Sequence, residues 1–394
     1  MTELAAADAQ LFWLSSKLPN DQFLVFVFDG EPAPGALDQV RRRAETHAEF
    51  RLRVADDSRW RYPRWVPAPV TDEQFVVHDG VGHDGVGPAS GDFRVIARLG
   101  QIDATRMTWR LHLFPPDVVV VQVSHALGDG TRSSALAAAL LGRGAPMPAP
   151  APPRPGPLLW RAAVAARKHR ELPPPTPPRP AVSVNDAPAG EAVLRTLVVG
   201  RDRLRTPTVT VAALSAIGAA LGGYLADRGE DVSRLGAEVP VAGPSTAQSR
   251  NNFRNVSIGL HPELDPHERA GRIAAELAAA RRRGEHPATR AAVEAFAATP
   301  AALLRWGMGR FDPTLRSSTV VGNTVVSSVY RGPADLSFGG RPVRYTAGFP
   351  ALSPMQSLTH GVHGIGDAVA ISVHADSVTV DVDDYLDRLA CALR

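Results

Sequence analysis

The chain has 394 residues, a length that predicts two domains of ordinary size or one unit with a pseudo-repeated plan. Apolar residues make up 44% of it, enough for substantial cores, and the formal net charge is only +3. The arginines are scattered among acidic residues, without the basic and aromatic interleaving that a nucleic-acid surface needs, so nucleic-acid binding is not expected.

Taken in chain order, the residue patterns predict two groups of strands and helices. In the first half, helices are expected over 5–14, 34–50 and 131–141, and strands over 23–28, 62–66, 74–77, 107–114 and 118–123. In the second half, strands are expected over 192–199, 238–241, 319–330, 342–347, 358–362, 368–374 and 378–380. Helices are expected over 209–227, 265–283, 300–306 and 383–393. The helix start at Asp265 is the clearest, with Pro266 at the first helical position and Glu268 at the third.

A proline-rich stretch separates the two groups. We therefore expect a two-lobed α+β protein, with an N-terminal lobe over 1–142, a linker or crossover over 143–183 and a C-terminal lobe over 184–394. A short basic helix over 158–170 interrupts this linker and carries Trp160. It fits either an anionic membrane surface or a solvated helix that packs one tryptophan against the body. A cleft between the lobes is the expected ligand site.

The most informative stretch begins with the valine-rich run 118–123 and leads through His125, Asp129 and Gly130 into an alanine-rich helical pattern. A histidine at the end of a buried strand is held rigidly, while the turn beside it leaves room for a substrate. An isolated histidine of this kind is usually an ordinary hydrogen-bonded residue. The strand before it, the glycine after Asp129 and the following helix favour the catalytic interpretation.

A second stretch, over 78–91, is rich in glycine, histidine and aspartate. Gly80, Gly82 and Gly85 match a dinucleotide-binding spacing, but the Pro-Ala-Ser-Gly sequence over 88–91 cannot open the helix that such a site requires. The paired His-Asp units also suggest a metal, yet a flexible loop is the preferred interpretation. The single cysteine, Cys391, excludes an internal disulfide framework and a cysteine metal site. No metal is expected.

With these elements placed, the chain resembles the bacterial wax ester synthase/diacylglycerol acyltransferase (WS/DGAT) family. That family shares its fold group with chloramphenicol acetyltransferase and peptide-synthetase condensation domains. The resemblance covers most of the chain and rests on segments 7–12, 103–113, 124–130, 251–253, 327–333 and 343–394. Segment 124–130 matches the His-His-x-x-x-Asp-Gly signature except that Ser124 replaces the first histidine. The family's Asn-Asp pair is absent, because Thr210 and Val211 stand at that place, and the chain is short for the family.

The resemblance implies two chloramphenicol acetyltransferase-like lobes and acyl transfer from acyl-CoA, as co-substrate, to a hydroxyl group. No bound cofactor is implied. His125 would be the general base, and Asp129 and Gly130 belong to its loop, with Asp129 expected to hold the loop and not to relay protons. A serine nucleophile is not expected, because no Gly-x-Ser-x-Gly elbow is present. Further substrate-binding or oxyanion candidates are Ser124, Trp109, Asn252, Asn323, Ser327 and Ser328.

Two other functions stay open at this point. One is ester or amide formation on a natural-product scaffold, with acyl-CoA or an acyl carrier protein as donor. The other is a lipid-binding protein that has lost catalysis. The start of the chain lacks the basic region of a signal peptide, and no apolar run is expected to reach the roughly 18 residues that span a bilayer. We therefore expect a cytoplasmic protein, with peripheral contact to the inner membrane surface as an open alternative.

Overall fold

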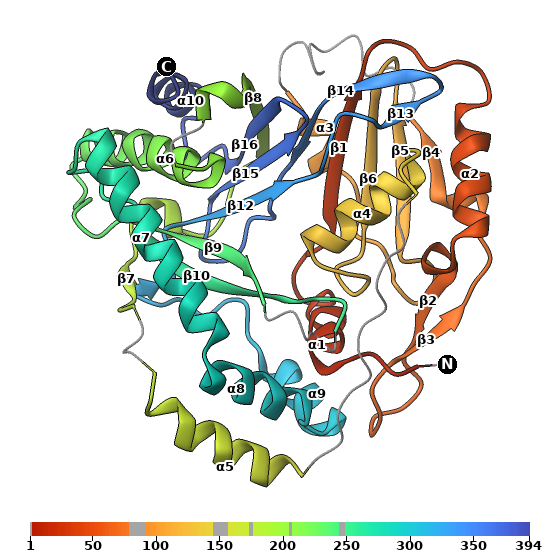
Figure 1. The fold of residues 1–394 in the computed structure, drawn as a ribbon, viewed down its shortest axis with the longest axis horizontal. Helices are drawn as coiled ribbons and strands as arrows, with labels where there is room; N and C mark the ends of the chain where they lie inside the picture. Colours follow the sequence, from red (N-terminus) through yellow and green to blue (C-terminus); the bar gives the residue numbers. More distant parts are fainter. Residues whose placement is uncertain (1, 79–91, 145–156, 173–175, 205–206, 244–248) are drawn as a thin grey trace.

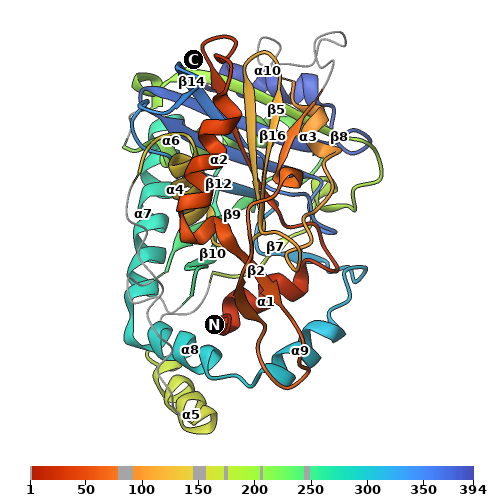
Figure 2. The same ribbon diagram turned by 90° about the vertical axis from the view of Figure 1, so that its right-hand side faces the viewer.

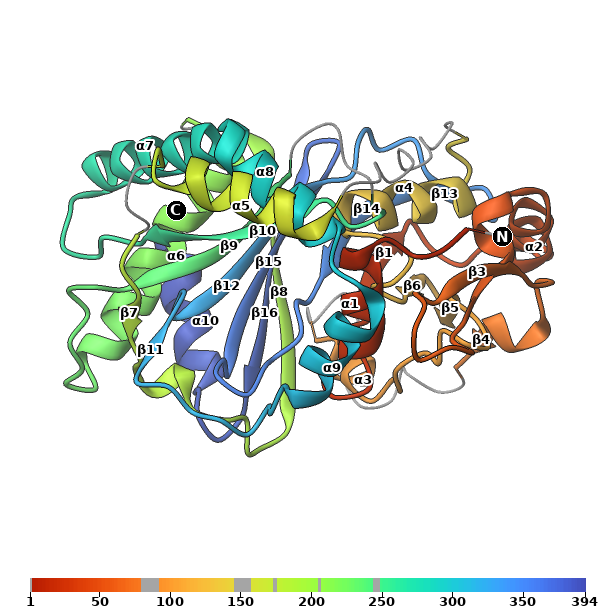
Figure 3. The same ribbon diagram turned by 90° about the horizontal axis from the view of Figure 1, so that it is seen from below.

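In the computed structural model, the structure describes residues 2–78, 92–144, 157–172, 176–204, 207–243 and 249–394. These residues form two six-stranded mixed sheets (Figures 1 and 3). The first sheet has the order β13 (Ser337–Phe338), β14 (Arg341–Gly348), β1 (Gln22–Phe28), β6 (Val118–Val123), β5 (Trp109–Phe114) and β4 (Phe75–Val77). The second has the order β10 (Phe253–Gly259), β9 (Gly236–Ala242), β12 (Thr324–Tyr330), β15 (Leu358–Ile365), β16 (Ala368–Asp376) and β8 (Ala192–Gly200). The mixed α+β class predicted from the sequence is therefore confirmed.

Helices cover each sheet. The described helices are α1 (Ala6–Leu14), α2 (Ala36–Thr46), α3 (Arg94–Ala97), α4 (Gly130–Leu140), α5 (Leu158–His169), α6 (Val209–Ala226), α7 (Pro266–Glu285), α8 (Pro287–Ala297), α9 (Ala301–Arg310) and α10 (Val382–Ala392). One hydrophobic core packs α2 and α4 against the first sheet, and another packs α6, α7 and α10 against the second (Figure 2). Two-stranded pairs, β2 (Leu52–Ala55) with β3 (Arg64–Pro67) and β7 (Arg179–Pro180) with β11 (Thr319–Val320), lie outside these sheets.

The sheets do not divide at one point of the chain. Strand β14 belongs to the second half of the sequence, yet it pairs antiparallel with β1, so that Leu24 lies opposite Gly348 and Val27 opposite Tyr345. A third core joins the two sheets, with Val120 of β6 and Ala370 of β16 among its members. The segment 184–394 thus contributes strands to both sheets, because β14 leaves the second lobe to extend the first.

Local sequence signals fix several element ends. Asp265 caps α7 by accepting hydrogen bonds from the backbone N–H groups of His267 and Glu268, with Pro266 at the first position, as predicted. The strand expected over 319–330 is broken into β11 and β12. A Cβ atom at Gly322 would lie 2.1 Å from the backbone nitrogen of Glu238, so the chain passes too close to β9 there to continue as a regular strand. The strand expected over 378–380 is wrong, because 377–379 form a turn.

Helix α6 corrects another expectation. It has 18 residues with a mean hydropathy of 1.7, so one described helix is long and apolar enough to cross a bilayer by length and composition. In the structure 67% of it is buried against its neighbours, including Tyr385 of α10 and Ile273 of α7 in the same core. Burial on nearly all sides explains its composition, because a helix inside a core needs no polar face.

Candidate active site

His125 lies where the central strand of the first sheet ends. All six residues of β6 are buried between β1 and β5, which explains the valine-rich run. Just after β6, the Ser124 N–H donates a hydrogen bond to the Thr108 carbonyl oxygen at 2.9 Å, next to β5. The chain then turns, and the Leu127 N–H donates to the Ser124 carbonyl oxygen. A rigid strand end therefore positions the half-buried imidazole.

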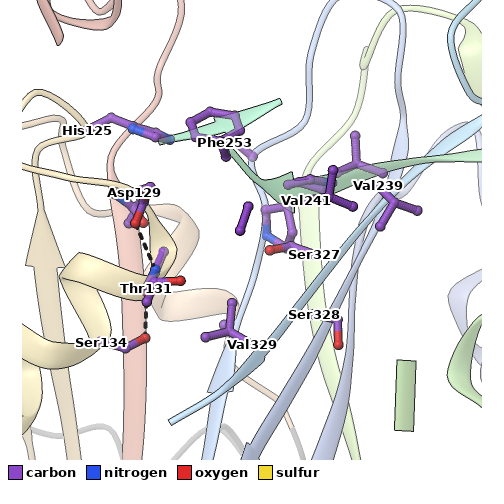
Figure 4. Close-up of a pocket in the computed structure, with 18 of the residues that line it drawn as sticks. His125, Asp129, Thr131, Ser134, Val239, Val241, Phe253, Ser327, Ser328 and Val329 are labelled. Atoms are coloured by element: carbon purple, nitrogen blue, oxygen red, sulfur yellow. Dashed lines mark hydrogen bonds between the residues drawn. The ribbon is translucent and has the colours of Figure 1, made fainter. Parts of the chain in front are cut away.

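Asp129 fixes the loop after His125 in two directions. Its Oδ1 accepts hydrogen bonds from the backbone N–H groups of Thr131 (3.1 Å) and Arg132 (3.0 Å) and so caps α4. Its Oδ2 accepts the N–H of Asn252 at 2.9 Å. The carboxylate thus ties the His125 loop to the segment that enters β10 of the other sheet, through backbone N–H groups on both sides. Figure 4 shows the hydrogen bond from Thr131 to Asp129.

Asn251 holds the imidazole itself. The Asn251 Nδ2 donates to Asp8 Oδ1 (2.9 Å) and to the His125 carbonyl oxygen (2.8 Å), and neither oxygen is a donor when Asp8 is ionised. This arrangement assigns Oδ1 of Asn251 to the His125 Nδ1, 2.8 Å away. Because an amide oxygen only accepts, Nδ1 must carry the proton.

The tautomer follows from this network. With the proton on Nδ1, the lone pair of the neutral ring lies on Nε2. No described residue hydrogen-bonds Nε2, which leaves that nitrogen for a substrate proton. Burial lowers the pKa of His125 below its ordinary 6.5, opposed by hydrogen bonds to its own carbonyl oxygen and to Asn251 and by the charge of Asp129. The imidazole is therefore neutral at pH 7.

Asp8 supports this arrangement from α1. Its Oδ1 also accepts the Asn251 N–H (2.9 Å), and its Oδ2 accepts the Arg250 N–H (3.0 Å). Burial raises the pKa of Asp8 above its ordinary 3.8, while these hydrogen bonds and the Arg250 charge oppose the rise. Arg250 and Arg132 both pair with Glu49, whose pKa is lowered by those two arginines against the effect of its own burial. The 250–252 segment is thus held by two carboxylates of the N-terminal half besides Asp129.

A cavity of about 980 Å³ opens beside His125 and is lined by both sheets. Figure 4 shows His125, Asp129, Thr131 and Ser134 on one side, facing Val239, Val241, Phe253, Ser327, Ser328 and Val329 on the other. The His125 ring lies 5.6 Å from the Phe253 ring, centroid to centroid. The lining combines valine and phenylalanine side chains with hydroxyl, imidazole and charged groups, so the cavity suits a ligand with both apolar and polar parts.

The structure brings six of the residues expected from the sequence to this cavity. They are His125, Asp129, Gly130, Asn252, Ser327 and Ser328. The Ser328 hydroxyl is already hydrogen-bonded to that of Thr210 at 2.8 Å, whereas no described residue bonds the Ser327 hydroxyl. Ser327 is therefore the more available hydroxyl donor.

Three of the expected substrate-binding residues lie elsewhere. Trp109 is fully buried in the first core, where its indole N–H donates to the Phe50 carbonyl oxygen. Ser124 is buried and is not a lining residue, because it still belongs to the end of the β6 ladder. Asn323 is buried and joins the Gly236 N–H to the Pro180 carbonyl oxygen, a structural bridge beside the break before β12.

Most of the glycine- and histidine-rich stretch, residues 79–91, lies outside the described residues, and the metal and loop interpretations of it stay predictions. His78 is described and lies 3.0 Å from Nδ1 of His112, which in turn contacts Gln122. Within the described ranges, no group of three or more His, Cys, Asp or Glu side chains is arranged to hold a metal ion.

Sequence reasoning missed Asp8 and Asn251 as functional residues. Both stand in segments that resemble the WS/DGAT family, 7–12 and 251–253, so a signal was present. The sequence could not show that Asn251, and not Asn252, reaches the imidazole, because that depends on the path of the backbone before β10.

Comparisons with known proteins agree with this fold. Residues 251–394 match the model of the WS/DGAT C-terminal domain. No curated protein sequence matches the chain. Among solved structures, the wax ester synthase/diacylglycerol acyltransferase from Marinobacter aquaeolei VT8 is similar with a TM-score of 0.63 and 18% identity, over 100% of this chain and 98% of that one.

Condensation domains are similar to nearly the same degree. The starter condensation domain of rhizomide synthetase RzmA, a mutant in complex with C8-CoA and Leu-SNAC, gives a TM-score of 0.62 at 15% identity, covering 100% of this chain and 92% of that one. The first condensation domain of the calcium-dependent antibiotic synthetase, in complex with a substrate analogue, gives 0.60 at 14%, covering 100% and 94%. Residues 251–394 thus match the WS/DGAT C-terminal domain, and the whole chain has the fold shared by wax ester synthase/diacylglycerol acyltransferase and condensation domains.

Proposed function

We propose that the chain is an acyltransferase that moves an acyl group from a thioester, acyl-CoA in the first instance, to a hydroxyl acceptor. The observation that carries the proposal is a neutral His125 with its Nδ1 proton held by Asn251, at a cavity of about 980 Å³ that both sheets line. The WS/DGAT domain match and the similar acyltransferase and condensation-domain structures support acyl transfer as the reaction class.

The proposed reaction needs no covalent enzyme intermediate. Nε2 of His125 accepts the hydroxyl proton of the acceptor as that oxygen attacks the thioester carbon. The new C–O bond forms, the C–S bond breaks, and the imidazolium returns the proton to the departing thiolate. The hydrogen bond to Asn251 Oδ1 persists throughout, because Nδ1 keeps its proton in both states of the ring.

General-base help is worth about 100- to 10,000-fold, so stabilisation of the oxyanion must supply part of the remainder. Ser327 is the proposed donor, because it lines the cavity and its hydroxyl has no described partner. In this proposal Asp129 only positions the His125 loop, by accepting hydrogen bonds from backbone N–H groups of α4 and of Asn252. Asn252 lines the cavity and is a second substrate contact in this proposal.

The test uses the purified chain with acyl-CoA donors of several lengths and alcohol acceptors. We expect thioester-dependent ester formation, and a loss of kcat of about 100- to 10,000-fold in His125→Ala. The exposed His267→Ala is the matched control and should keep full activity. Unchanged turnover in His125→Ala would overturn the base assignment.

Ester or amide formation on a natural-product scaffold is the second candidate, because two condensation domains resemble the chain about as closely as the wax ester synthase does. Amine acceptors and acyl-carrier donors in the same assay separate the two: amide product or preference for the carrier thioester favours this candidate. No turnover with any thioester, together with binding of acyl chains, would favour a lipid-binding protein.

We further propose that this protein acts in the cytoplasm and contacts the inner membrane surface. Large apolar side chains are exposed on three helices that lie on the same side of the molecule (Figures 1 and 3): Leu159, Trp160, Val293, Phe296, Leu303 and Trp306. We name these residues the α5–α8–α9 face. The exposed cations Arg167, Arg170 and Arg310 flank it, with Arg310 stacked over Trp306 at 5.2 Å. Apolar groups edged by arginines suit an anionic bilayer surface.

A further inference from the structure

Arg331 is a buried cation at the seam between the two sheets. It follows directly after β12, and its side chain reaches β14 and β1 of the other sheet. Nη1 donates to the Thr346 hydroxyl and, at 3.1 Å, to the Ala347 carbonyl oxygen, while the guanidinium lies over the Phe26 ring at 5.3 Å. Only 6% of the residue is exposed, and it lines the same cavity as His125.

All of these partners are neutral. No described carboxylate pairs with Arg331, and its Nε is buried with no hydrogen-bond partner within the described part of the chain. Burial alone lowers the pKa of Arg331 to about 9, so the group is still a cation at pH 7. A buried charge without a counter-charge is strongly destabilising, and such an arrangement is retained where a ligand supplies the opposite charge.

His363 of β15 adds a second unpaired group at the same point. It lies opposite Val329 of β12 in the parallel register, lines the cavity and is 6% exposed. Its Nδ1 is buried with no partner in the described residues. Burial and the Arg331 charge hold the pKa of His363 well below 6.5, so the ring is neutral and can donate one N–H.

Two glycines make room for this pair. A Cβ atom at Gly348 would lie 2.8 Å from His363 Cε1 and 3.0 Å from Arg331 Nη2, and one at Gly361 would lie 2.8 Å from the same Cε1. Both side chains therefore approach one small volume beside Gly348. Larger residues at either glycine would push the two groups apart.

We propose that Arg331 and His363 form a carboxylate-binding subsite, and that one of the two substrates carries a carboxylate on its acyl chain or on its acceptor. This inference rests on the proposed acyl transfer. Nη1 makes both hydrogen bonds to the protein, which leaves Nε and Nη2 on one edge of the guanidinium plane. In this proposal Nη2 donates to one carboxylate oxygen, and a small turn of the guanidinium brings Nε, which is buried in this conformation, to the second oxygen. His363 lies beside them.

The experiment uses matched pairs that differ only in the carboxylate. Glutaryl-CoA and its methyl ester are compared as donors to one alcohol, and a hydroxy acid and its methyl ester are compared as acceptors from one acyl-CoA. We expect the parent to prefer the carboxylate member of one pair by about 10- to 100-fold in kcat/KM. The pair that shows the preference identifies which substrate carries the group.

Arg331→Gln should reduce that preference to near one, mainly by raising KM for the charged member. Arg281→Gln is the matched control, because Arg281 also lines the cavity but is exposed, and it should leave the preference intact. Should Arg331→Gln fail to fold, Arg331→Lys keeps the charge without the planar fork, and it should lower the preference without abolishing it.

The outcomes separate this inference from the proposed function. Turnover of neutral substrates with no preference for either carboxylate would overturn the subsite and leave acyl transfer standing. No turnover with any thioester would count against acyl transfer. Calorimetric titration with glutarate then tests the subsite alone: binding in the parent and its loss in Arg331→Gln would support it, and equal or absent binding in both would overturn it.

Discussion

Asp21 is predicted to destabilise the folded protein at neutral and alkaline pH. It precedes β1, lines the cavity and is 7% exposed. Its Oδ2 accepts hydrogen bonds from the Ile102 N–H and the Gln122 side chain, both at 2.7 Å, whereas its Oδ1 is buried without a described partner. Burial raises the pKa of Asp21 from 3.8 to about 6, and these two hydrogen bonds and the charge of Arg110 oppose the rise only in part.

The direction in which stability changes with pH follows from this raised pKa. A carboxyl group with a raised pKa in the folded state binds its proton more tightly than in the unfolded state, so its contribution is fully present below pH 3.8 and is lost as the pH rises through about 6. The difference between 3.8 and about 6 corresponds to about 3 kcal/mol at pH 8, at 1.36 kcal/mol for each pH unit, and to about 1.5 kcal/mol at pH 5.

Asp21→Asn removes this penalty. The amide oxygen can accept both existing hydrogen bonds, whereas the amide N–H groups at the position of Oδ1 have no described acceptor and subtract the same amount from the gain at every pH. We therefore expect the variant to exceed the parent in free energy of unfolding by up to about 3 kcal/mol at pH 8 and by up to about 1.5 kcal/mol at pH 5.

Urea unfolding followed by circular dichroism at both pH values is the assay. Asp387→Asn, at an exposed position of α10, is the control and should change little at either pH. A variant no more stable than the parent at pH 8, or a gain of equal size at both pH values, would refute the reasoning.

Three further predictions concern the site and its surroundings. Asn251→Leu should lower kcat by about 10- to 100-fold, because the imidazole loses its orienting acceptor. The acidic limb of its pH–rate profile should move to lower pH, since the Asn251 hydrogen bond raises the pKa of His125; an unmoved limb would contradict the role. Ser327→Ala should lower kcat by about 100-fold, as expected for a lost oxyanion donor, whereas Ser328→Ala, whose hydroxyl is already paired, serves as control. Equal losses in the two variants would remove the distinction. Trp306→Ser on the α5–α8–α9 face should lower the fraction of protein that sediments with anionic phospholipid vesicles. Phosphatidylcholine vesicles should bind the parent poorly. If the parent binds neither kind of vesicle, the membrane contact is excluded.

Much of the fold was predictable because its signals are local. The valine run predicted β6, and the Asp265-Pro266 start predicted α7, since period and capping act within a few residues. The assignment of β14 to the first sheet was not predictable. Its own pattern identifies a strand, but its partner β1 lies more than three hundred residues earlier, and nothing within 341–348 encodes that pairing.

The residues of the site differ in the same way: some are predictable from local sequence and others depend on distant contacts. His125 and Asp129 stand in one short motif with a strand before it and a helix after it, so the sequence predicts that they lie together at the strand end. Arg331 has no such context, because a single arginine after a strand usually lies at the surface. Only the packing of β14 and β1 over the end of β12 turns it into a buried cation facing the cavity.

The proposed general base therefore depends on three distant parts of the chain. His125 supplies the ring, Asn251 fixes its proton on Nδ1, and Asp8 fixes the orientation of the Asn251 amide. Asp129 joins the first two by holding the Asn252 N–H. Without the 250–252 segment the first sheet carries a histidine of undefined tautomer, and without α1 that segment loses the carboxylate that orients it. Assembly of the whole fold, and not of the His125 motif alone, thus produces an imidazole with its lone pair on Nε2, next to a cavity that the same assembly forms.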